Sequence, residues 1–273
     1  MSDITVIILT KNEEKNIEAC VNSAQQIAKR IIVVDSGSTD KTVELAEKNG
    51  AETVYHEWVG HARQFNWALD NCNIDTQWVF RLDADERISK ELAKEILQKL
   101  SSEESLGVNG YEMRWRMYFM GKQLKHGGNN KTYIVRLFRF GKARVEDKSM
   151  DERFVVEGKI ERLNSSFIHY DYKTLDDWLI KHINYSRLEL QLYNGDYSDN
   201  TIEKDTTQKQ KRGLYYKLPR YLRARLYYWY RYYIQLGFLD GEAGKIFIYL
   251  QAYWYRFIVD AKIYEQLEGK EKK

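Results

Sequence analysis

The chain has 273 residues, of which 43% are hydrophobic and 30% charged, values typical of a globular protein with a sizeable core. Its formal net charge of +3 is too small to indicate a nucleic-acid-binding protein. The two cysteines, Cys20 and Cys72, lack the spacing of a metal site, so we expect buried thiols. The sequence has no signal-peptide pattern and no apolar segment long enough to span a membrane, which predicts a cytoplasmic protein.

Apolar stretches rich in β-branched residues alternate with helical patterns in the N-terminal part of the chain. The sequence predicts strands over residues 4–9, 31–34, 53–55 and 78–82. It predicts helices over residues 14–29, 40–49 and 62–72. This alternation indicates βαβ units and a mostly parallel sheet, whose strands end along one edge. Ligands of open α/β sheets bind at that edge.

Polar clusters follow three of the predicted strands, at residues 10–13, 35–40 and 83–86. We expect them to converge on one crevice. Asp83 and Asp85 are two residues apart and can bind one Mg²⁺ or Mn²⁺, with phosphate oxygens completing its coordination. A solvated turn is the alternative, because a D-x-D triplet occurs about once by chance in a chain of this length. Asp35 can accept a hydrogen bond from a ribose or a base, or cap the next helix.

The sequence contains neither the G-x-G-x-x-G motif of dinucleotide-binding folds nor the P-loop motif. We therefore expect a nucleotide whose phosphates are met by a metal rather than by glycine-rich backbone. A nucleotidyltransferase would share the acidic sheet edge, but it needs a glycine-rich, basic triphosphate loop, which residues 10–16 do not supply.

The middle of the chain predicts two further strands, over residues 111–119 and 133–138, with residues 126–130 as a flexible loop over a site. Arg136 and Arg139 lie in or beside the second strand. They either face a diphosphate or anionic acceptor, or lie on a solvated strand face.

The C-terminal part predicts a helix from Leu175 that packs on the sheet, then a polar stretch, then two amphipathic helices joined by a glycine turn. We expect a catalytic domain over residues 1–195, a loop or linker over 196–214 and a helical extension over 215–273. The extension is rich in Arg, Tyr and Trp, which suits the headgroup layer of a membrane surface. The alternative is packing on the catalytic domain or on a second copy in a homodimer.

Three motifs occur in order along the chain, within residues 5–13, 32–42 and 82–86. Together they resemble family-2 glycosyltransferases with the GT-A fold. Residues 60–70, 136–139 and 169–170 give a closer resemblance to bacterial lipopolysaccharide inner-core β-1,4-glucosyltransferases. The resemblance implies an α/β, GT-A-type fold: a mostly parallel central sheet flanked by helices, here with a C-terminal helical hairpin.

The resemblance also implies roles for individual residues. The residues that would contact the nucleotide sugar are Leu9, Thr10, Asn12, Glu13, Asp35, Arg63, Asn66, Asp83 and Arg136. Arg63 and Asn66 lie on the helix that closes over the nucleotide. Asp85 corresponds to the main metal ligand, Asp83 to a ligand of ribose or metal, and His169 to a late histidine that contacts the metal or the diphosphate. The donor is then a UDP-sugar and the cofactor Mn²⁺ or Mg²⁺.

A transferase of this kind needs a base to take the proton of the acceptor hydroxyl. The family's acidic catalytic motif corresponds to Asp151 and Glu152, where the subgroup commonly has His-Glu. We expect Glu152 to be the base, with Asp151 as the alternative. A surface ion pair with Arg153 would instead make both residues structural.

These inferences predict an inverting, metal-dependent glycosyltransferase. It would move a sugar such as glucose from a UDP-sugar to a saccharide hydroxyl of a lipopolysaccharide-core or other lipid-linked acceptor. We expect it at the inner face of the cytoplasmic membrane, as a peripheral protein. The alternative is a non-catalytic nucleotide- or saccharide-binding protein on the same fold.

Overall fold

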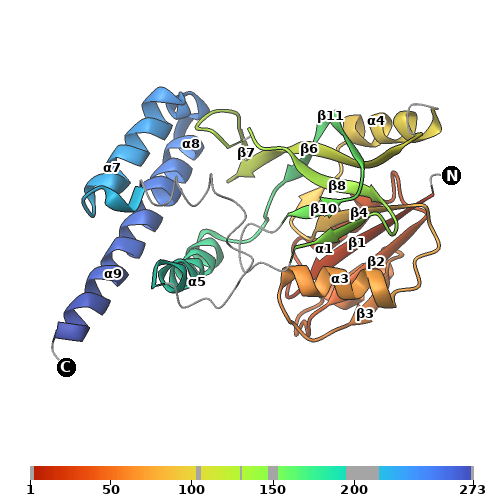
Figure 1. The fold of residues 1–273 in the computed structure, drawn as a ribbon, viewed down its shortest axis with the longest axis horizontal. Coiled ribbons are helices and arrows are strands. Elements are labelled where there is room, and N and C mark those ends of the chain that lie inside the picture. Colours follow the sequence, from red (N-terminus) through yellow and green to blue (C-terminus); the bar gives the residue numbers. More distant parts are fainter. Residues whose placement is uncertain (1–2, 103–105, 130, 147–152, 195–214, 272–273) are drawn as a thin grey trace. The chain divides into compact units, whose positions relative to one another are not determined.

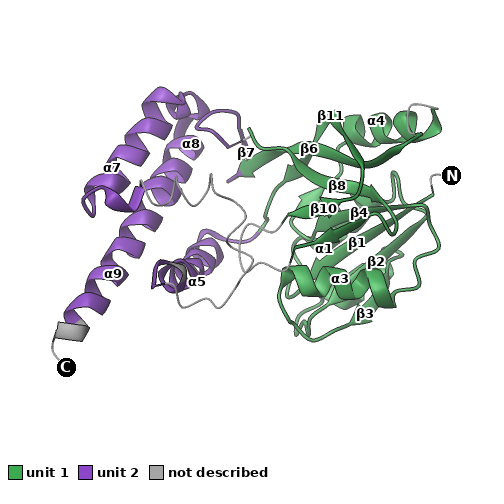
Figure 2. Ribbon diagram, in the orientation of Figure 1, with its two compact units in different colours: residues 1–118, 130–172 green, residues 119–129, 173–273 purple. Residues whose placement is uncertain are grey.

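The structure is a computed structural model, and it describes residues 3–102, 106–129, 131–146, 153–194 and 215–271. The chain divides into two compact units (Figures 1 and 2). Unit 1 comprises residues 1–118 and 130–172, and unit 2 comprises residues 119–129 and 173–273. Helix α5 (Leu175–Asn194), expected to pack on the sheet, belongs to unit 2. The domain boundaries predicted at residues 195 and 214 stay predictions, because the segment between them lies outside the described residues.

Unit 1 contains the predicted central sheet, whose strands run in the order β3-β2-β1-β4-β8-β6-β11-β5. Strands β3, β2, β1 and β4 are parallel, and β6 is parallel to β11. Strand β8 is antiparallel to both of its neighbours, and β5 is antiparallel to β11. The strands of this path are β1 (Ile4–Thr10), β2 (Arg30–Asp35), β3 (Glu52–Tyr55), β4 (Trp78–Asp83), β5 (Glu86–Arg87), β6 (Val108–Phe119), β8 (Ile134–Arg139) and β11 (Lys159–His169). Strands β9 (Ala143–Val145) and β10 (Phe154–Val156) form a separate antiparallel pair.

Alternate residues of the central strands face opposite sides of the sheet. In β1, Val6 and Ile8 join one core cluster, whereas Ile7 and Leu9 join the other. Helices α1 and α4 add buried residues to the first cluster, and α3 adds them to the second. Both faces of β1 are therefore covered, as its continuous apolar run predicts. Each cluster also contains one free, buried cysteine, which confirms the expected buried thiols.

Three helices of unit 1 occur where the sequence predicts them, with different bounds: α1 (Ile17–Ala24), α2 (Thr42–Lys48) and α3 (His61–Asn71). A fourth helix, α4 (Lys90–Ser101), follows β5. Helix α1 is shorter than the predicted 14–29. It begins late because the preceding residues form a turn, in which the Asn16 N–H donates to the Glu13 carbonyl at 2.8 Å.

Unit 2 contains the predicted helical hairpin. Its elements are β7 (Lys122–Leu124), α5, α7 (Leu222–Trp229), the π-helical segment η3 (Tyr230–Ile234), the 3₁₀ turn η4 (Gly237–Asp240), α8 (Gly241–Ile248), the π-helical segment η5 (Tyr249–Trp254) and α9 (Tyr255–Glu271). Helix α7 packs on η5, and α5 packs on α9. Among the described residues, no helix has both the length and the apolar character that crossing a membrane requires.

Part of the loop predicted over a site is bonded to the hairpin turn. The Asp240 carboxylate accepts the N–H groups of Lys125 and His126 at 3.0 and 2.9 Å. Arg231 Nε donates to the Gly127 carbonyl at 2.7 Å. His126, Gly127 and Asn129 of this loop therefore have specific partners within unit 2.

The segment formed by α7 and η3 packs through a face that carries two arginines, one from each element. Arg223 and Arg231 are buried, while Leu222, Leu226 and Trp229 are exposed. Arg223 donates to the buried Asp260 carboxylate through Nε at 2.8 Å and also through Nη2. The amphipathic pattern of the sequence is thus present, with its apolar face outward.

We predict that Arg223→Leu destabilises the protein by about 3–5 kcal/mol, because Asp260 is then a buried charge without its ionic partner. Adding Asp260→Asn should recover most of this loss, since the amide oxygen can still accept from the Tyr221 N–H. Urea denaturation measures the effect. The control Arg187→Leu, at an exposed position of α5, should change stability by less than about 0.5 kcal/mol. Equal losses in Arg223→Leu and the double variant would contradict a buried-charge origin.

Candidate active site

The polar clusters after β1, β2 and β4 meet at one edge of the sheet. Strand register pairs Thr10 of β1 with Asp35 of β2, and Leu9 of β1 with Asp83 of β4. The three strands are parallel neighbours in the order β2-β1-β4. The three strand ends therefore lie along one edge of the sheet, as the sequence predicts (Figure 1), while the crevice expected at that edge stays a prediction.

Asp35 holds the loop that follows β2. Its Oδ2 accepts the N–H groups of Gly37 and Ser38 at 2.9 and 2.8 Å, and its Oδ1 accepts the Ser38 hydroxyl. Gly37 has a φ of 87°, a conformation that favours glycine. The side chain is buried. Asp35 therefore shapes the loop, while its expected contact with ribose or base stays a prediction.

The loop after β1 is bonded to the loop after β2. The Asn12 N–H donates to Ser38 Oγ at 2.8 Å, and Asn12 Oδ1 accepts the Thr39 N–H at 2.8 Å. The Glu13 N–H donates to Thr42 Oγ1 at 2.7 Å. Asn12 takes part with a left-handed backbone, at a φ of 54°, which asparagine tolerates better than most residues. These bonds hold the loops after β1 and β2, two of the predicted nucleotide-binding segments, against each other.

Leu9 and Thr10, the last two residues of β1, are buried. The Thr10 hydroxyl is enclosed and has no hydrogen-bond partner within the part of the chain that the structure describes. In this arrangement, a nucleotide contact by Thr10 would be made through its backbone or would need a side-chain rotation.

Two arginine side chains lie beside the carboxylates that follow β4. Arg81 Nε donates to Asp83 Oδ1 at 3.3 Å, and Arg136 Nη2 donates to Asp83 Oδ2 at 3.1 Å. The same Arg136 nitrogen lies 2.6 Å from Glu86 Oε1. Glu86 Oε2 accepts the Asp83 N–H at 3.0 Å. Arg136 is buried between these carboxylates, which excludes the solvated strand face as its position.

The arginines control the charge of this cluster. Burial acts to raise the pKa of the Asp83 carboxyl, but the charges of Arg136 and Arg81 hold it well below its usual range. Burial raises the pKa of Glu86; Arg136 opposes the rise, and the charges of Asp83 and Asp85 add to it. Asp83 is therefore the ionised partner of Arg136.

Asp85 lies beside His169, at the end of β11. His169 Nδ1 is 3.7 Å from Asp85 Oδ1. Strand register pairs His169 with Glu86, and the Tyr170 N–H donates to the Asp85 carbonyl at 2.9 Å. The structure thus brings together two of the residues predicted to contact a metal. They come from positions that are far apart in the sequence.

The donor set fits a metal that shares its coordination with substrate. A carboxylate oxygen and an imidazole nitrogen suit Mn²⁺. Among the described residues, no group of three His, Cys, Asp or Glu side chains is arranged to hold a metal. A cation at Asp85 and His169 would therefore take its remaining ligands from phosphate and water, as Mg²⁺ sites commonly do.

The two predicted residues of α3 lie in different settings. Asn66 Nδ2 donates to the Val145 carbonyl at 2.8 Å, and its Oδ1 accepts the Val145 N–H at 3.0 Å. The Asn66 amide therefore fastens α3 to β9. Arg63 is exposed in the first turn of α3. The predicted contact of either residue with a nucleotide stays a prediction.

Sequence reasoning missed Gln64 and Arg81. Gln64 is fully buried, and its Nε2 donates to Ser36 Oγ and to the His56 carbonyl, each at 3.0 Å. It thereby supports the β2 loop from α3, and no pattern in the sequence signals this role. Arg81 does have a signal, since it is the one basic residue inside the otherwise apolar stretch of β4.

A comparison with family models agrees with the site geometry. The model described as "Glycosyl transferase family 2" matches residues 5–153, which include all three strand-end clusters. The chain belongs to this family. The α/β architecture with C-terminal helices expected of a GT-A-type member is present.

Individual relatives of this glycosyltransferase cover different parts of it. The lipopolysaccharide core biosynthesis glycosyltransferase LpsC of Rhizobium meliloti (strain 1021) is 28% identical over 276 residues, spanning 96% of this chain and 92% of LpsC. An uncharacterized glycosyltransferase of Rickettsia bellii (strain RML369-C) is 42% identical over 111 residues, or 41% of this chain and 37% of that protein. Among solved structures, this chain is similar to glucosyl-3-phosphoglycerate synthase from Mycobacterium tuberculosis in complex with Mn²⁺, UDP and glucosyl-3-phosphoglycerate. The match covers 41% of this chain and 44% of the synthase chain, at 25% sequence identity and a TM-score of 0.35.

The predicted base of the glycosyltransferase lies outside the described residues. Asp151 and Glu152 belong to the segment 147–152, which the structure does not describe. Their roles, and the choice between them, stay predictions.

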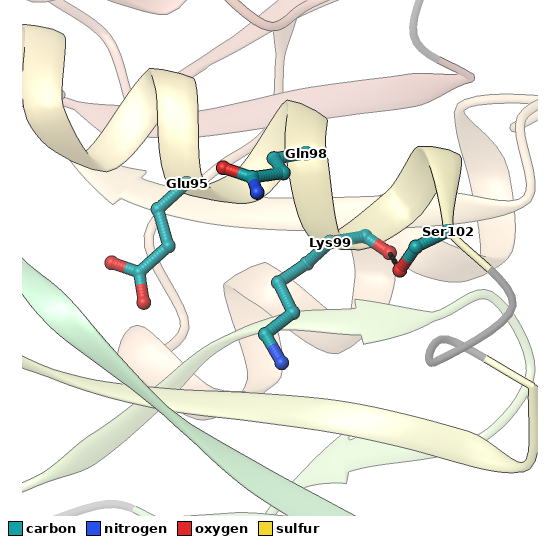
Figure 3. A pocket seen from close by; sticks show the side chains of 4 residues that line it. All are labelled: Glu95, Gln98, Lys99 and Ser102. Atoms are coloured by element: carbon teal, nitrogen blue, oxygen red, sulfur yellow. Dashed lines mark hydrogen bonds between the residues drawn. The ribbon is translucent and has the colours of Figure 1, made fainter.

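A pocket on α4 is separate from the strand-end clusters. Glu95, Gln98, Lys99 and Ser102 line it, as Figure 3 shows. Glu95 accepts the N–H groups of Asn164 and Ser165 at 2.8 and 2.7 Å, which fastens α4 to β11. None of the lining residues is a predicted site residue of the glycosyltransferase.

We predict that Arg136→Met destabilises this glycosyltransferase by about 3–5 kcal/mol, because it removes the shared partner of two carboxylates. Arg136 holds the pKa of Asp83 below its unfolded value, so its contribution is present above about pH 4 and falls as the pH is lowered further. Urea denaturation at several pH values tests both statements.

The matched control is Arg162→Met. Arg162 Nε lies 2.6 Å from Glu112 Oε1, the same separation as in the Arg136–Glu86 pair, but Arg162 is exposed. Its loss should cost less than about 1 kcal/mol. Similar losses of stability in the two variants would show that the contribution of the Arg136 ion pairs does not depend on their burial.

Proposed function

We propose that this glycosyltransferase moves a sugar from a UDP-sugar to a saccharide hydroxyl, with inversion and with a divalent metal. The observation that carries the proposal is the pairing of Asp85 with His169 at the edge where the β1, β2 and β4 loops meet. Asp83, the last residue of β4, is already paired with Arg81 and Arg136. The edge therefore offers one carboxylate and one imidazole to a cation, beside loops that suit a nucleotide.

In the proposed reaction, the acceptor oxygen attacks the anomeric carbon while the bond from that carbon to the diphosphate oxygen breaks. UDP leaves, and the acceptor proton passes to the carboxylate base, Glu152 in our prediction. Residues 10–13 and Asp35 hold the nucleoside, with Arg63 and Asn66 on the helix beside it. Asp85 and His169 would hold a Mn²⁺ or Mg²⁺, and Asp83 would contact that ion or the ribose. Such an ion would supply positive charge to neutralise the departing diphosphate.

We propose a lipopolysaccharide-core or other lipid-linked saccharide as the acceptor, and glucose as the first donor sugar to test. Support comes from the resemblance in the motifs and from LpsC, whose name assigns it to lipopolysaccharide core biosynthesis and whose similarity spans 92% of its length. A lipid-linked acceptor would place the enzyme at the inner face of the cytoplasmic membrane, as a peripheral protein.

We predict that EDTA abolishes UDP release from the productive UDP-sugar and that Mn²⁺ or Mg²⁺ restores it. Asp85→Asn should lower the rate at saturating metal at least about 100-fold, because the metal loses its carboxylate. His169→Ala should raise the concentration of Mn²⁺ needed for half-maximal activity more than that of Mg²⁺, since imidazole suits Mn²⁺ better. Glu112→Gln is the control on the same domain. Full activity of Asp85→Asn would contradict the metal assignment.

A separate pair of variants tests the base. Glu152→Gln should lower transfer about 10²–10⁴-fold with little change in UDP-sugar affinity, whereas Asp151→Asn should lower it less. Single-turnover transfer and isothermal titration with UDP measure the two quantities. The opposite ranking would assign the base to Asp151. Binding of UDP-sugars with no turnover in the wild-type protein, across sugars and acceptors, would favour a non-catalytic binding protein.

A further inference from the structure

We propose that unit 2 docks on an anionic lipid surface through the outward face of α7, η3 and η4. We assign to this apolar face six exposed side chains of the segment: Leu222, Leu226, Trp229, Tyr233, Ile234 and Phe238. The inference rests on the proposed function in one respect: a lipid-linked acceptor would explain why the enzyme docks on a membrane. The structural argument for the docking face is independent of that function.

The first support is how much apolar surface this face exposes. The six side chains are between 44% and 57% exposed. Leu222, Leu226, Trp229 and Tyr233 are spaced by four, three and four residues, so they form one stripe along the helix. Trp229 contacts Tyr233 at a ring separation of 5.9 Å, Tyr233 contacts Tyr232, and Tyr232 contacts Phe238. Contiguous exposed apolar patches of this kind mark interaction sites.

The second support is that this segment buries charged side chains, which is energetically unfavourable unless they have polar partners. Arg223 and Arg231 fill the inward face of the same segment, bonded to Asp260 and to the Gly127 carbonyl. Burying a charge requires such partners, whereas leucine or tryptophan could be buried without them. The segment thus buries two of its arginines and leaves its large apolar residues outside, which is advantageous only if something apolar covers the outer face.

Charge identifies the occupant as lipid rather than a second copy. Residues 215–239 contain no Asp or Glu. Lys217, Arg220 and Arg225 are exposed along this segment. A copy related by a two-fold axis would place the same basic residues against one another, whereas anionic headgroups complement them. Tryptophan and tyrosine also suit the headgroup layer, where their apolar rings and polar tips are both satisfied.

The docking is parallel to the membrane plane. Among the described residues, no helix can cross a bilayer. The apolar stripe lies along one side of the helical segment, which is the geometry of an interfacial helix. Basic residues flank the stripe and can reach headgroup phosphates while the apolar side chains enter the acyl boundary.

The test is co-sedimentation of the full-length protein with phosphatidylcholine vesicles and with mixed phosphatidylcholine–phosphatidylglycerol vesicles. We expect binding to the mixed vesicles, weakening as salt is added. Leu226→Ser/Trp229→Ser should weaken it at least about tenfold, and Lys217→Glu/Arg225→Glu should do the same through charge. The matched control Ile180→Ser/Leu267→Ser alters exposed apolar residues of α5 and α9 and should bind like wild type. Circular dichroism confirms that each variant is folded.

Two further readouts separate the possible outcomes. Absence of vesicle binding, or equal binding by wild type and Leu226→Ser/Trp229→Ser, would overturn the inference. A wild-type dimer that this variant converts to a monomer, with no vesicle binding, would assign the face to a subunit interface instead. UDP release from a panel of UDP-sugars without vesicles reports on the proposed function alone. Its failure with intact vesicle binding would reject that function and leave the docking face standing.

Discussion

The acidic edge of unit 1 depends on the position of Arg136 between two carboxylates. Three acidic residues lie within four positions at the end of β4 and just beyond it, and like charges this close oppose one another's ionisation. Arg136, from the neighbouring strand β8, contacts Asp83 and Glu86 with one nitrogen. Arg81 adds a second positive charge on the far side of Asp83. Asp85 is the member of the turn that lies beside His169 instead.

The convergence of the strand ends could be predicted because it follows from short-range patterns. Apolar runs identify β1, β2 and β4, and the helices between them require parallel strands with a common edge. The partners of each side chain could not be predicted in the same way. Asn66 bonds to Val145, 79 residues away, and Asp35 bonds within its own loop. The residue type permits both a ligand contact and a structural contact, and tertiary packing decides between them.

The orientation of α7 shows a second limit of sequence patterns. Periodicity separates an apolar face from a basic one, but it does not say which face is inside. That choice depends on Asp260, 37 residues from Arg223, and on the carbonyl of Gly127, 104 residues from Arg231. An arginine with such partners can be buried, and the leucines of the opposite face are then left at the surface. The hairpin could therefore be predicted, and its outward face could not.

Buried arginines have different consequences in the two units. Replacing a buried ion pair by apolar residues is often neutral or stabilising, so such pairs are poorly explained by stability alone. In unit 1, the positive charge of Arg136 allows several carboxylates to lie close together. An enzyme can use such a cluster to bind a cation. In unit 2, Arg223 and Arg231 occupy the inward side of the helix and leave its apolar side available. In both units the buried arginines are better understood by what they leave available beside them: the partly buried Asp85 and His169 in one, and the exposed stripe containing Leu226 in the other.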